Sequence, residues 1–359
     1  MPETTSEQPF PWPVGCASGV GSLPGADPAE AVRLVFGELP DLPYLAELPA
    51  RGPGADLTGR TAALLVDLPV ETTPGGWRFA ARPGRDLGRA RAMLSADLDA
   101  LEEVASGYQG PLKVQVCGPW TLAATIGLLR SQDPALADPG AVADLTDSLA
   151  EGAAAHVADV SKRVPGAVVL LQVDEPAISS VLRGMVPTAS GLNRLPAPEA
   201  PAAAAGLRRV LSVSPAYSVV HCCAASVPFG IIKDAGADAV GFDLSQVSPG
   251  AEEALAETAE AGLGIFAGAV AVPRSPGSAW AAPAPSAVAR RVTGLWQRMG
   301  WPVSRSAGAA AGRADVAGQV VLTPACGLAS ASPAQAKAAM AGCREAARLL
   351  PELIEEERP

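Results

Sequence analysis

A histidine and two cysteines are the residues of this sequence best suited to bind a metal ion: His221, Cys223 and Cys326. Zinc prefers imidazole and thiolate ligands in a tetrahedron, and a position left open for substrate distinguishes a catalytic site from a structural one. Side chains two positions apart on a strand point to the same side, so His221 and Cys223 can reach one ion while Cys222 points away. The pattern indicates a zinc site, and its alternative is a core histidine among buried cysteines.

Two carboxylates end a strongly apolar run in the middle of the chain. Asp174 and Glu175 follow residues 168–173 and precede Pro176, which cannot donate to a strand ladder. Carboxylates beside such a core are unfavourable unless they have partners. The ammonium group of a ligand is one partner for Asp174, and a helix N-terminus or an arginine is the alternative.

Three further positions have side chains that suit a small polar ligand. Gly21-Ser22 offers backbone and hydroxyl donors for a carboxylate, or it forms an ordinary turn. Glu47 follows a short β-rich run and on its own is a surface acid. Trp120 lies in the rigid turn Gly118-Pro119-Trp120, where it can stack on a flat cofactor or pack in the core.

The elements that must position these residues alternate between short β-rich runs and helical patterns. Eight runs predict strands, at 14–20, 43–47, 112–117, 167–173, 217–220, 239–242, 264–270 and 319–322. Helical patterns lie between them, at 28–36, 87–106, 142–163, 201–211, 227–235, 252–261, 286–298 and 333–350. Apolar strands alternating with helices are typical of a parallel sheet with both faces covered. Eight such units favour an α/β fold of the closed (β/α)8 TIM-barrel type, with an open doubly wound sheet as the alternative.

One segment does not fit the repeating unit. Residues 56–82 contain the β-rich stretches 62–70 and 77–81 around Thr73-Pro74-Gly75-Gly76, and we interpret them as a β-hairpin inserted after the second strand. We expect a flexible N-terminus over residues 1–13 and one barrel domain over residues 14–355. No internal repeat or second domain is evident.

The predicted strand ends bring the candidate residues to one place. In such barrels the active site lies at the carboxyl ends of the strands. That edge would carry Ser22, Glu47, Cys117, Asp174, Glu175, His221, Cys223, Asp243 and Cys326. The end of the eighth strand can approach the fifth across the barrel mouth, so Cys326 can join His221 and Cys223.

Composition narrows the functional classes. The chain has 359 residues, 48% of them hydrophobic, and a formal net charge of -10, which argues against nucleic acid or an anionic membrane as partner. It has no uninterrupted apolar stretch of about 18 residues and no basic start followed by an apolar run, so we expect no membrane span and no signal peptide. We therefore expect a cytoplasmic protein whose six cysteines are reduced.

The motifs together resemble the catalytic barrel of cobalamin-independent methionine synthase, in its short core form. They occur in the family's order and span most of the chain: Gly21-Ser22, Gly118-Pro119-Trp120-Thr121, Gln172-Val173-Asp174-Glu175-Pro176-Ala177, His221-Cys222-Cys223 and Pro324-Ala325-Cys326-Gly327-Leu328. The Asp-Glu-Pro-Ala and Cys-Gly-Leu elements are fairly specific, whereas Gly-Ser is not.

The resemblance implies a zinc-dependent methyltransferase that methylates homocysteine to methionine. The family binds homocysteine as a thiolate on zinc, and the matching ligands here are His221, Cys223 and Cys326. Its remaining ligand is a glutamate, and Asp243 stands at that position with a side chain one methylene shorter. The resemblance also assigns the amino-acid end of homocysteine to the following residues: Ser22, Glu47 and Asp174.

Departures from the family pattern bear on the methyl donor. The chain has no room for the additional N-terminal barrel that helps the full-length family to bind folate. The family's Asp-x-His after the seventh strand, suited to proton delivery, is replaced by residues 264–271 with no acid or histidine. Protonation of a folate leaving group is therefore weakened more than thiol activation, and we expect a methylcorrinoid, free or protein-bound, to serve better than methyl-folate.

Two other functions remain open from the sequence. One is methyl transfer between a corrinoid and another thiol, and the other is a diverged, non-catalytic barrel that binds a thiol or an amino acid. Uroporphyrinogen decarboxylation, known in the wider superfamily, is disfavoured because its propionate-rich substrate would call for basic residues that the site does not offer. Metal content discriminates best, because a metal-free protein would favour the binding barrel.

Overall fold

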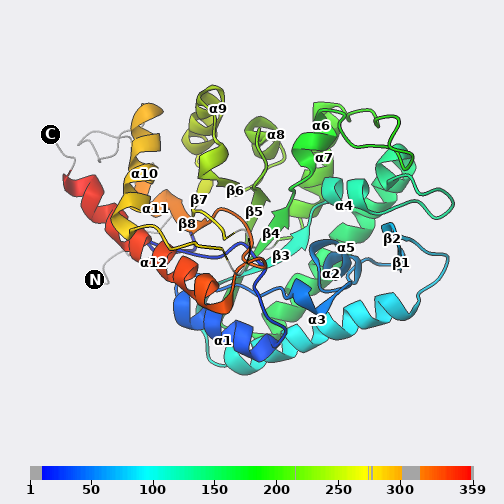
Figure 1. The fold of residues 1–359 in the computed structure, drawn as a ribbon, viewed down its shortest axis with the longest axis horizontal. Coiled ribbons are helices and arrows are strands. Elements are labelled where there is room, and N and C mark those ends of the chain that lie inside the picture. Colours follow the sequence, from blue (N-terminus) through cyan, green and yellow to red (C-terminus); the bar gives the residue numbers. More distant parts are fainter. Residues whose placement is uncertain (1–9, 215, 274, 276–277, 301–315, 357–359) are drawn as a thin grey trace, which may run out of the picture.

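Six parallel strands form one curled sheet in a computed structural model that describes residues 10–214, 216–273, 275, 278–300 and 316–356 (Figure 1). The sheet order follows the chain, β3-β4-β5-β6-β7-β8. The bounds are β3 (Gly110–Cys117), β4 (Ala167–Asp174), β5 (Tyr217–Cys222), β6 (Ala239–Asp243), β7 (Gly264–Val270) and β8 (Val320–Pro324). These strands confirm the last six predicted runs to within a few residues at each end.

Helices cover the outside of this sheet (Figure 1). They are α1 (Pro28–Glu38), α3 (Arg85–Val104), α4 (Pro119–Thr125), α5 (Pro139–Arg163), α6 (Ile178–Leu182), α7 (Ala200–Leu211), α8 (Phe229–Asp234), α9 (Pro249–Glu260), α10 (Pro285–Arg298), α11 (Val316–Gln319) and α12 (Pro333–Glu356). Many begin with proline, whose fixed φ and missing N–H suit the first helical position. No helix among the described residues is both long and apolar enough to span a bilayer.

Two extended segments, near residues 14–22 and 43–47, lie between the edges of the sheet, where the first two strands were predicted. They form no regular strand, but isolated parallel bridges pair Ala17 with Leu322 of β8, Ser22 with Glu47, and Tyr44 with Lys113 of β3. The parallel pairing thus continues from β8 back to β3, which is consistent with a TIM-like barrel. The prediction of regular strands at 14–20 and 43–47 was wrong, because glycines and a proline interrupt them. A side chain at Gly19 would overlap the ring of Tyr44, for example.

The segment 56–82 contains a short antiparallel hairpin. Its strands are β1 (Val70–Thr73) and β2 (Gly76–Phe79). The expected first arm at 62–70 was wrong: helix α2 (Leu57–Ala62) ends at its first residue, turns and irregular backbone follow, and β1 begins only at Val70. Asp56 starts this helix, since its Oδ1 accepts a hydrogen bond from the backbone N of Gly59 at 2.6 Å.

The bottom of the curled sheet is filled by aromatic side chains from the N-terminal segment. Phe10 and Trp12 are 7% and 2% exposed, and they stack on each other with ring centroids 5.0 Å apart. The edge of Trp12 meets Phe266 of β7, and its Nε1 donates to the carbonyl of Gly318. Both residues fall in the stretch predicted to be flexible, whose residues 1–9 lie outside the described part of the chain. The interior at this end is apolar, which leaves the carboxyl ends of the strands for polar chemistry.

Candidate metal and substrate site

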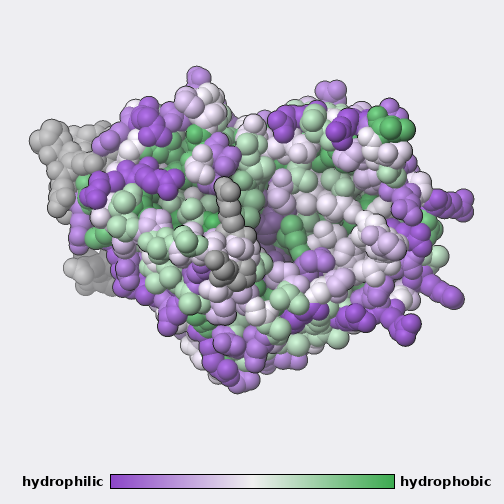
Figure 2. Space-filling view, in the orientation of Figure 1, coloured by the Kyte–Doolittle hydropathy of each residue, from purple (hydrophilic) through white to green (hydrophobic). Residues whose placement is uncertain are grey.

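One cavity of about 240 Å³ at the carboxyl ends of the strands gathers most of the candidate residues. Its lining includes Ser22, Glu47, Asp174, His221, Cys223 and Cys326, together with Gly21, Pro49, Leu57, Pro176 and Gly327. These residues come from β4, β5, the end of β8 and the two bridged segments. The face drawn in Figure 1 is largely polar at its rim and recessed near its middle (Figure 2).

Two thiols lie against each other in this cavity. The Sγ atoms of Cys223 and Cys326 are 3.2 Å apart, and neither cysteine is in a disulfide, which would need about 2.05 Å. Their shared hydrogen bond lowers the pKa of Cys326, and the nearby imidazole of His221 lowers it further against the effect of burial. The same hydrogen bond, followed by burial, raises the pKa of Cys223. The hydrogen bond between the two thiols thus favours ionisation of Cys326 over that of Cys223.

The imidazole of His221 is fixed by Asp174, on the neighbouring strand. The parallel register of β4 and β5 sets Asp174 opposite His221, and both are 6% exposed. Nδ1 of the ring donates to Oδ1 of Asp174 at 2.8 Å, and Gln172 Nε2 donates to the same oxygen at 2.8 Å. A carboxylate that holds one ring nitrogen fixes the tautomer and leaves Nε2 for a metal. Asp174 thus positions the histidine, in addition to facing the cavity.

Two sulfurs 3.2 Å apart and a fixed imidazole are donor types that zinc prefers. No group of three or more His, Cys, Asp or Glu side chains within the described residues meets the geometry expected of a metal site. Asp243 does not line the cavity, and its Oδ1 accepts hydrogen bonds from the backbone N and Oγ of Ser245 at 2.8 and 2.7 Å. Cys222 points away from the cavity, toward the hydroxyl of Ser179. The arrangement brings together the three predicted His and Cys ligands and keeps Asp243 apart.

Glu47 is the second carboxylate of the cavity and is 6% exposed. Burial raises its pKa to about 7; Asp174 acts in the same direction, while Arg60 and Lys113 oppose the shift. Arg60 Nε lies 3.9 Å from Glu47 Oε1, and Arg60 is itself paired with Asp97. A cation placed in the cavity would favour the ionised form of Glu47.

Three buried polar residues have roles that the sequence analysis missed: Glu175, Lys113 and Gln172. Glu175 is fully buried and accepts hydrogen bonds from the backbone N atoms of Trp120 and Thr121 at 2.9 and 2.8 Å, so it caps α4. Lys113 Nζ and Gln172 Nε2 both donate to the carbonyl of Val20, at 3.0 and 2.8 Å. They hold the segment that leads into Gly21-Ser22. Polar residues at alternate positions of an apolar strand were the available signal for them.

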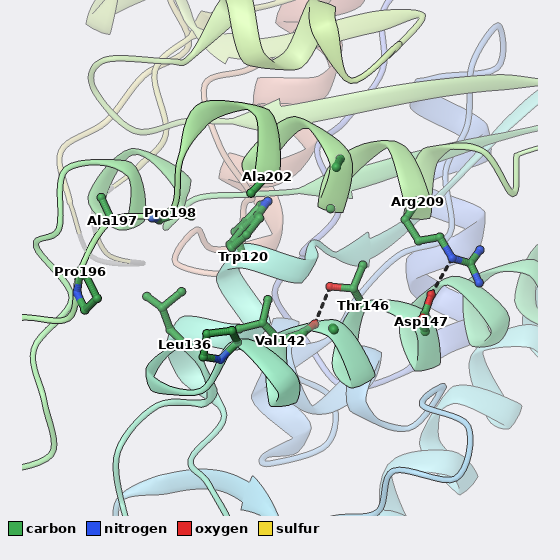
Figure 3. Close-up of a pocket in the computed structure, with 14 residues that line it drawn as sticks. Trp120, Leu136, Val142, Thr146, Asp147, Pro196, Ala197, Pro198, Ala202 and Arg209 are labelled. Atoms are coloured by element: carbon green, nitrogen blue, oxygen red, sulfur yellow. Dashed lines mark hydrogen bonds and ion pairs between the residues drawn. The ribbon is translucent and has the colours of Figure 1, made fainter.

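Trp120 lies apart from this cavity. It lines a larger, mostly apolar cavity of about 510 Å³ between α4, α5 and α7, near Leu136 and Val142 (Figure 3). Its Nε1 donates to the carbonyl of Ala203 at 3.0 Å, and the residue is 5% exposed. The only ion pair between residues that line this cavity joins Asp147 and Arg209. Trp120 therefore does not line the smaller cavity, which holds the other candidate residues.

Comparisons with known proteins give the family of the chain and support its fold. Residues 16–349 match the family described as "Cobalamin-independent synthase, Catalytic domain". A similar solved structure is that of a B12-independent methionine synthase from Shewanella sp. W3-18-1 in complex with selenomethionine. It is 12% identical with a TM-score of 0.62, over 96% of this chain and 100% of that one, so it supports the fold. No curated protein matches the sequence.

Proposed function

The chain belongs to the cobalamin-independent methionine synthase family and is therefore a methyltransferase, and from this premise we propose that it methylates homocysteine with the help of zinc. The single observation that carries the proposal is the convergence of two thiols, a fixed imidazole and two carboxylates on one cavity. Homocysteine presents a thiol, an ammonium group and a carboxylate, and each of these has a chemical counterpart there.

His221, Cys223 and Cys326 would hold the zinc ion. Zinc supplies a Lewis acid that lowers the pKa of a bound thiol and keeps it as a nucleophilic thiolate at neutral pH. Asp174 keeps the imidazole in the tautomer that binds metal. Asp243 is the proposed fourth ligand, and to act as one its carboxylate must leave the hydrogen bonds from Ser245.

The amino-acid end of homocysteine would lie against Ser22, Glu47 and Asp174, all of which line the cavity. The two carboxylates attract the ammonium group, and the hydroxyl of Ser22 can donate to the substrate carboxylate. These contacts orient the thiol toward Cys223 and Cys326. The relative of known structure was solved with selenomethionine, an amino acid of the same length as the methylated product.

For the methyl donor we retain a methylcorrinoid. Its support is the end of β7, where residues 264–271 offer no acid or histidine to protonate a folate leaving group. The family description, cobalamin-independent, lends this donor no support. The choice of donor therefore rests on β7 alone and is separate from the proposal for the thiol site.

The test of this proposal is methionine formation by the zinc-loaded protein. We expect methionine from homocysteine with methylcobalamin as donor, and slower formation with methyl-folate. Equal or faster turnover with methyl-folate would overturn the donor while leaving the thiol chemistry intact. A protein that binds no zinc and makes no methionine from either donor would contradict the proposed function.

The raised pKa of Glu47 predicts that substrate binding depends on pH. Its pKa of about 7 is raised by burial, so its negative charge is present above that pH and is lost below it. We expect wild-type protein to bind homocysteine about tenfold more tightly than Glu47→Gln near pH 8, and almost equally near pH 6. Calorimetric titrations of both proteins across this range give the ratio, and a ratio independent of pH would refute the role of the charge.

A further inference from the structure

Gln172 donates hydrogen bonds to two parts of the candidate site. It lies on β4, two positions before Asp174, so both side chains point to the same face of the sheet. Its Nε2 donates to Oδ1 of Asp174 and to the carbonyl of Val20, each at 2.8 Å. Asp174 orients His221, and Val20 directly precedes Gly21-Ser22 in the chain. One amide group thus holds the neighbours of a proposed zinc ligand and of the proposed carboxylate site.

The segment that contains Val20 depends on side chains for its position. Isolated bridges form at Ala17 and at Ser22, and Val20 lies between them with no bridge of its own in the described part of the chain. Its carbonyl accepts from Gln172 and, at 3.0 Å, from Nζ of Lys113. A regular strand would engage this carbonyl in a backbone ladder. Here side chains of β3 and β4 take the place of that ladder.

Gln172 lies behind the wall of the cavity and is 2% exposed. It does not line the cavity itself, whereas both of its acceptors belong to residues that do, Val20 and Asp174. A residue in this place can act on a ligand only through the groups that it holds. Removing a buried donor leaves its acceptors unpaired and free to move, which is costly.

We propose that Gln172 is a positioning residue that keeps Ser22 and the carboxylate of Asp174 at a fixed distance from each other. The inference rests on the proposed function, because it takes zinc and homocysteine as the ligands. Zinc would hold the thiol end of homocysteine and Ser22 its carboxylate end, so the spacing between them has to match the length of one substrate. Without the amide, Asp174 holds His221 less firmly and the segment at Ser22 keeps only the support of Lys113.

The test replaces Gln172 with methionine, which keeps the approximate volume of the side chain and removes its donors. Zinc affinity of the substrate-free protein is measured by competition with a chelator, and homocysteine affinity by calorimetric titration at saturating zinc. We expect zinc to bind about fivefold and homocysteine about tenfold more weakly than in wild type. Gln172→Asn keeps the amide on a shorter side chain and is expected to show smaller losses of both. A wild-type value of either affinity in Gln172→Met would overturn the inference.

A double-mutant cycle shows whether Gln172 acts on the zinc site through Asp174. In Asp174→Ala the acceptor of the amide is already gone. Adding Gln172→Met to that variant is therefore expected to change zinc affinity by less than about twofold. General loosening of the barrel would instead give a further loss of about fivefold, and that result would contradict the positioning role.

A matched control separates positioning from the loss of any buried amide. Gln319 is another buried glutamine, at the opposite end of β8 from Cys326, and its Nε2 donates to the carbonyls of Ala259 and Leu263 at 2.8 and 2.7 Å. Gln319→Met is expected to leave both affinities unchanged, and equal losses in this control would remove the special role of Gln172. Wild-type protein that binds neither zinc nor homocysteine would overturn the proposed function and this inference with it.

Discussion

Replacing Cys326 with serine is expected to remove zinc from the protein and to lower kcat/KM for methionine formation by about a thousandfold or more. The serine hydroxyl is not ionised at neutral pH and is a much weaker zinc ligand than a thiolate. The substitution also removes one of the two sulfurs that lie 3.2 Å apart in the cavity. Metal analysis after dialysis, together with steady-state kinetics, measures both effects.

The matched control for this variant is Cys222→Ala. Cys222 is adjacent to Cys223 in the chain, but it is fully buried and contacts Ser179 on the helical side of the strand. We expect this variant to keep its zinc and most of its activity. A Cys326→Ser protein with full zinc content and wild-type kcat/KM would remove Cys326 from the proposed site.

Replacing Asp174 with alanine is the second substitution with a large expected effect. Loss of a carboxylate that orients a ligating histidine typically weakens metal affinity by about 10–100-fold. Here the same side chain also faces the cavity, so we expect kcat/KM to fall further than zinc affinity does. Zinc affinity is measured by competition with a chelator, and kcat/KM at saturating zinc.

Two further variants show which function of Asp174 is lost. Asp174→Asn retains an acceptor for His221 Nδ1 and is expected to keep more zinc affinity than Asp174→Ala, while losing the charge that attracts the substrate amine. Asp238→Asn is the control, since Asp238 accepts from Ser218 at the amino end of β6, far from the cavity. Unchanged zinc affinity and kcat/KM in Asp174→Ala would contradict both roles.

The sequence predicted the sheet well where strands are continuous apolar runs ended by turns. The predicted and observed bounds of β7 are the same. The observed β4 and β5 extend one and two residues beyond their predicted ends. The irregular structure of the segments 14–20 and 43–47 could not be predicted from the sequence, because their pairing depends on long-range contacts. Lys113 and Gln172 hold the carbonyl of Val20 from across the interior, and no local pattern encodes that contact.

In the candidate site, too, the features set by local sequence patterns were predicted and those set by long-range contacts were not. The spacing of His221 and Cys223 was enough to place both at one cavity, since the period of a strand is local. The hydrogen bond between His221 and Asp174 was not predicted, because it depends on the register of β4 against β5. The surroundings of Asp243 and Trp120 likewise depend on partners that the motifs do not include, Ser245 and the carbonyl of Ala203.

Zinc K-edge X-ray absorption on the purified protein, with and without homocysteine, tests the central claim most directly. We expect about one zinc per chain with sulfur from Cys223 and Cys326 and nitrogen from His221 in its coordination shell. Homocysteine should add one further sulfur to that shell. A protein that takes up no zinc, or whose zinc has no sulfur ligand and does not respond to homocysteine, would contradict the account.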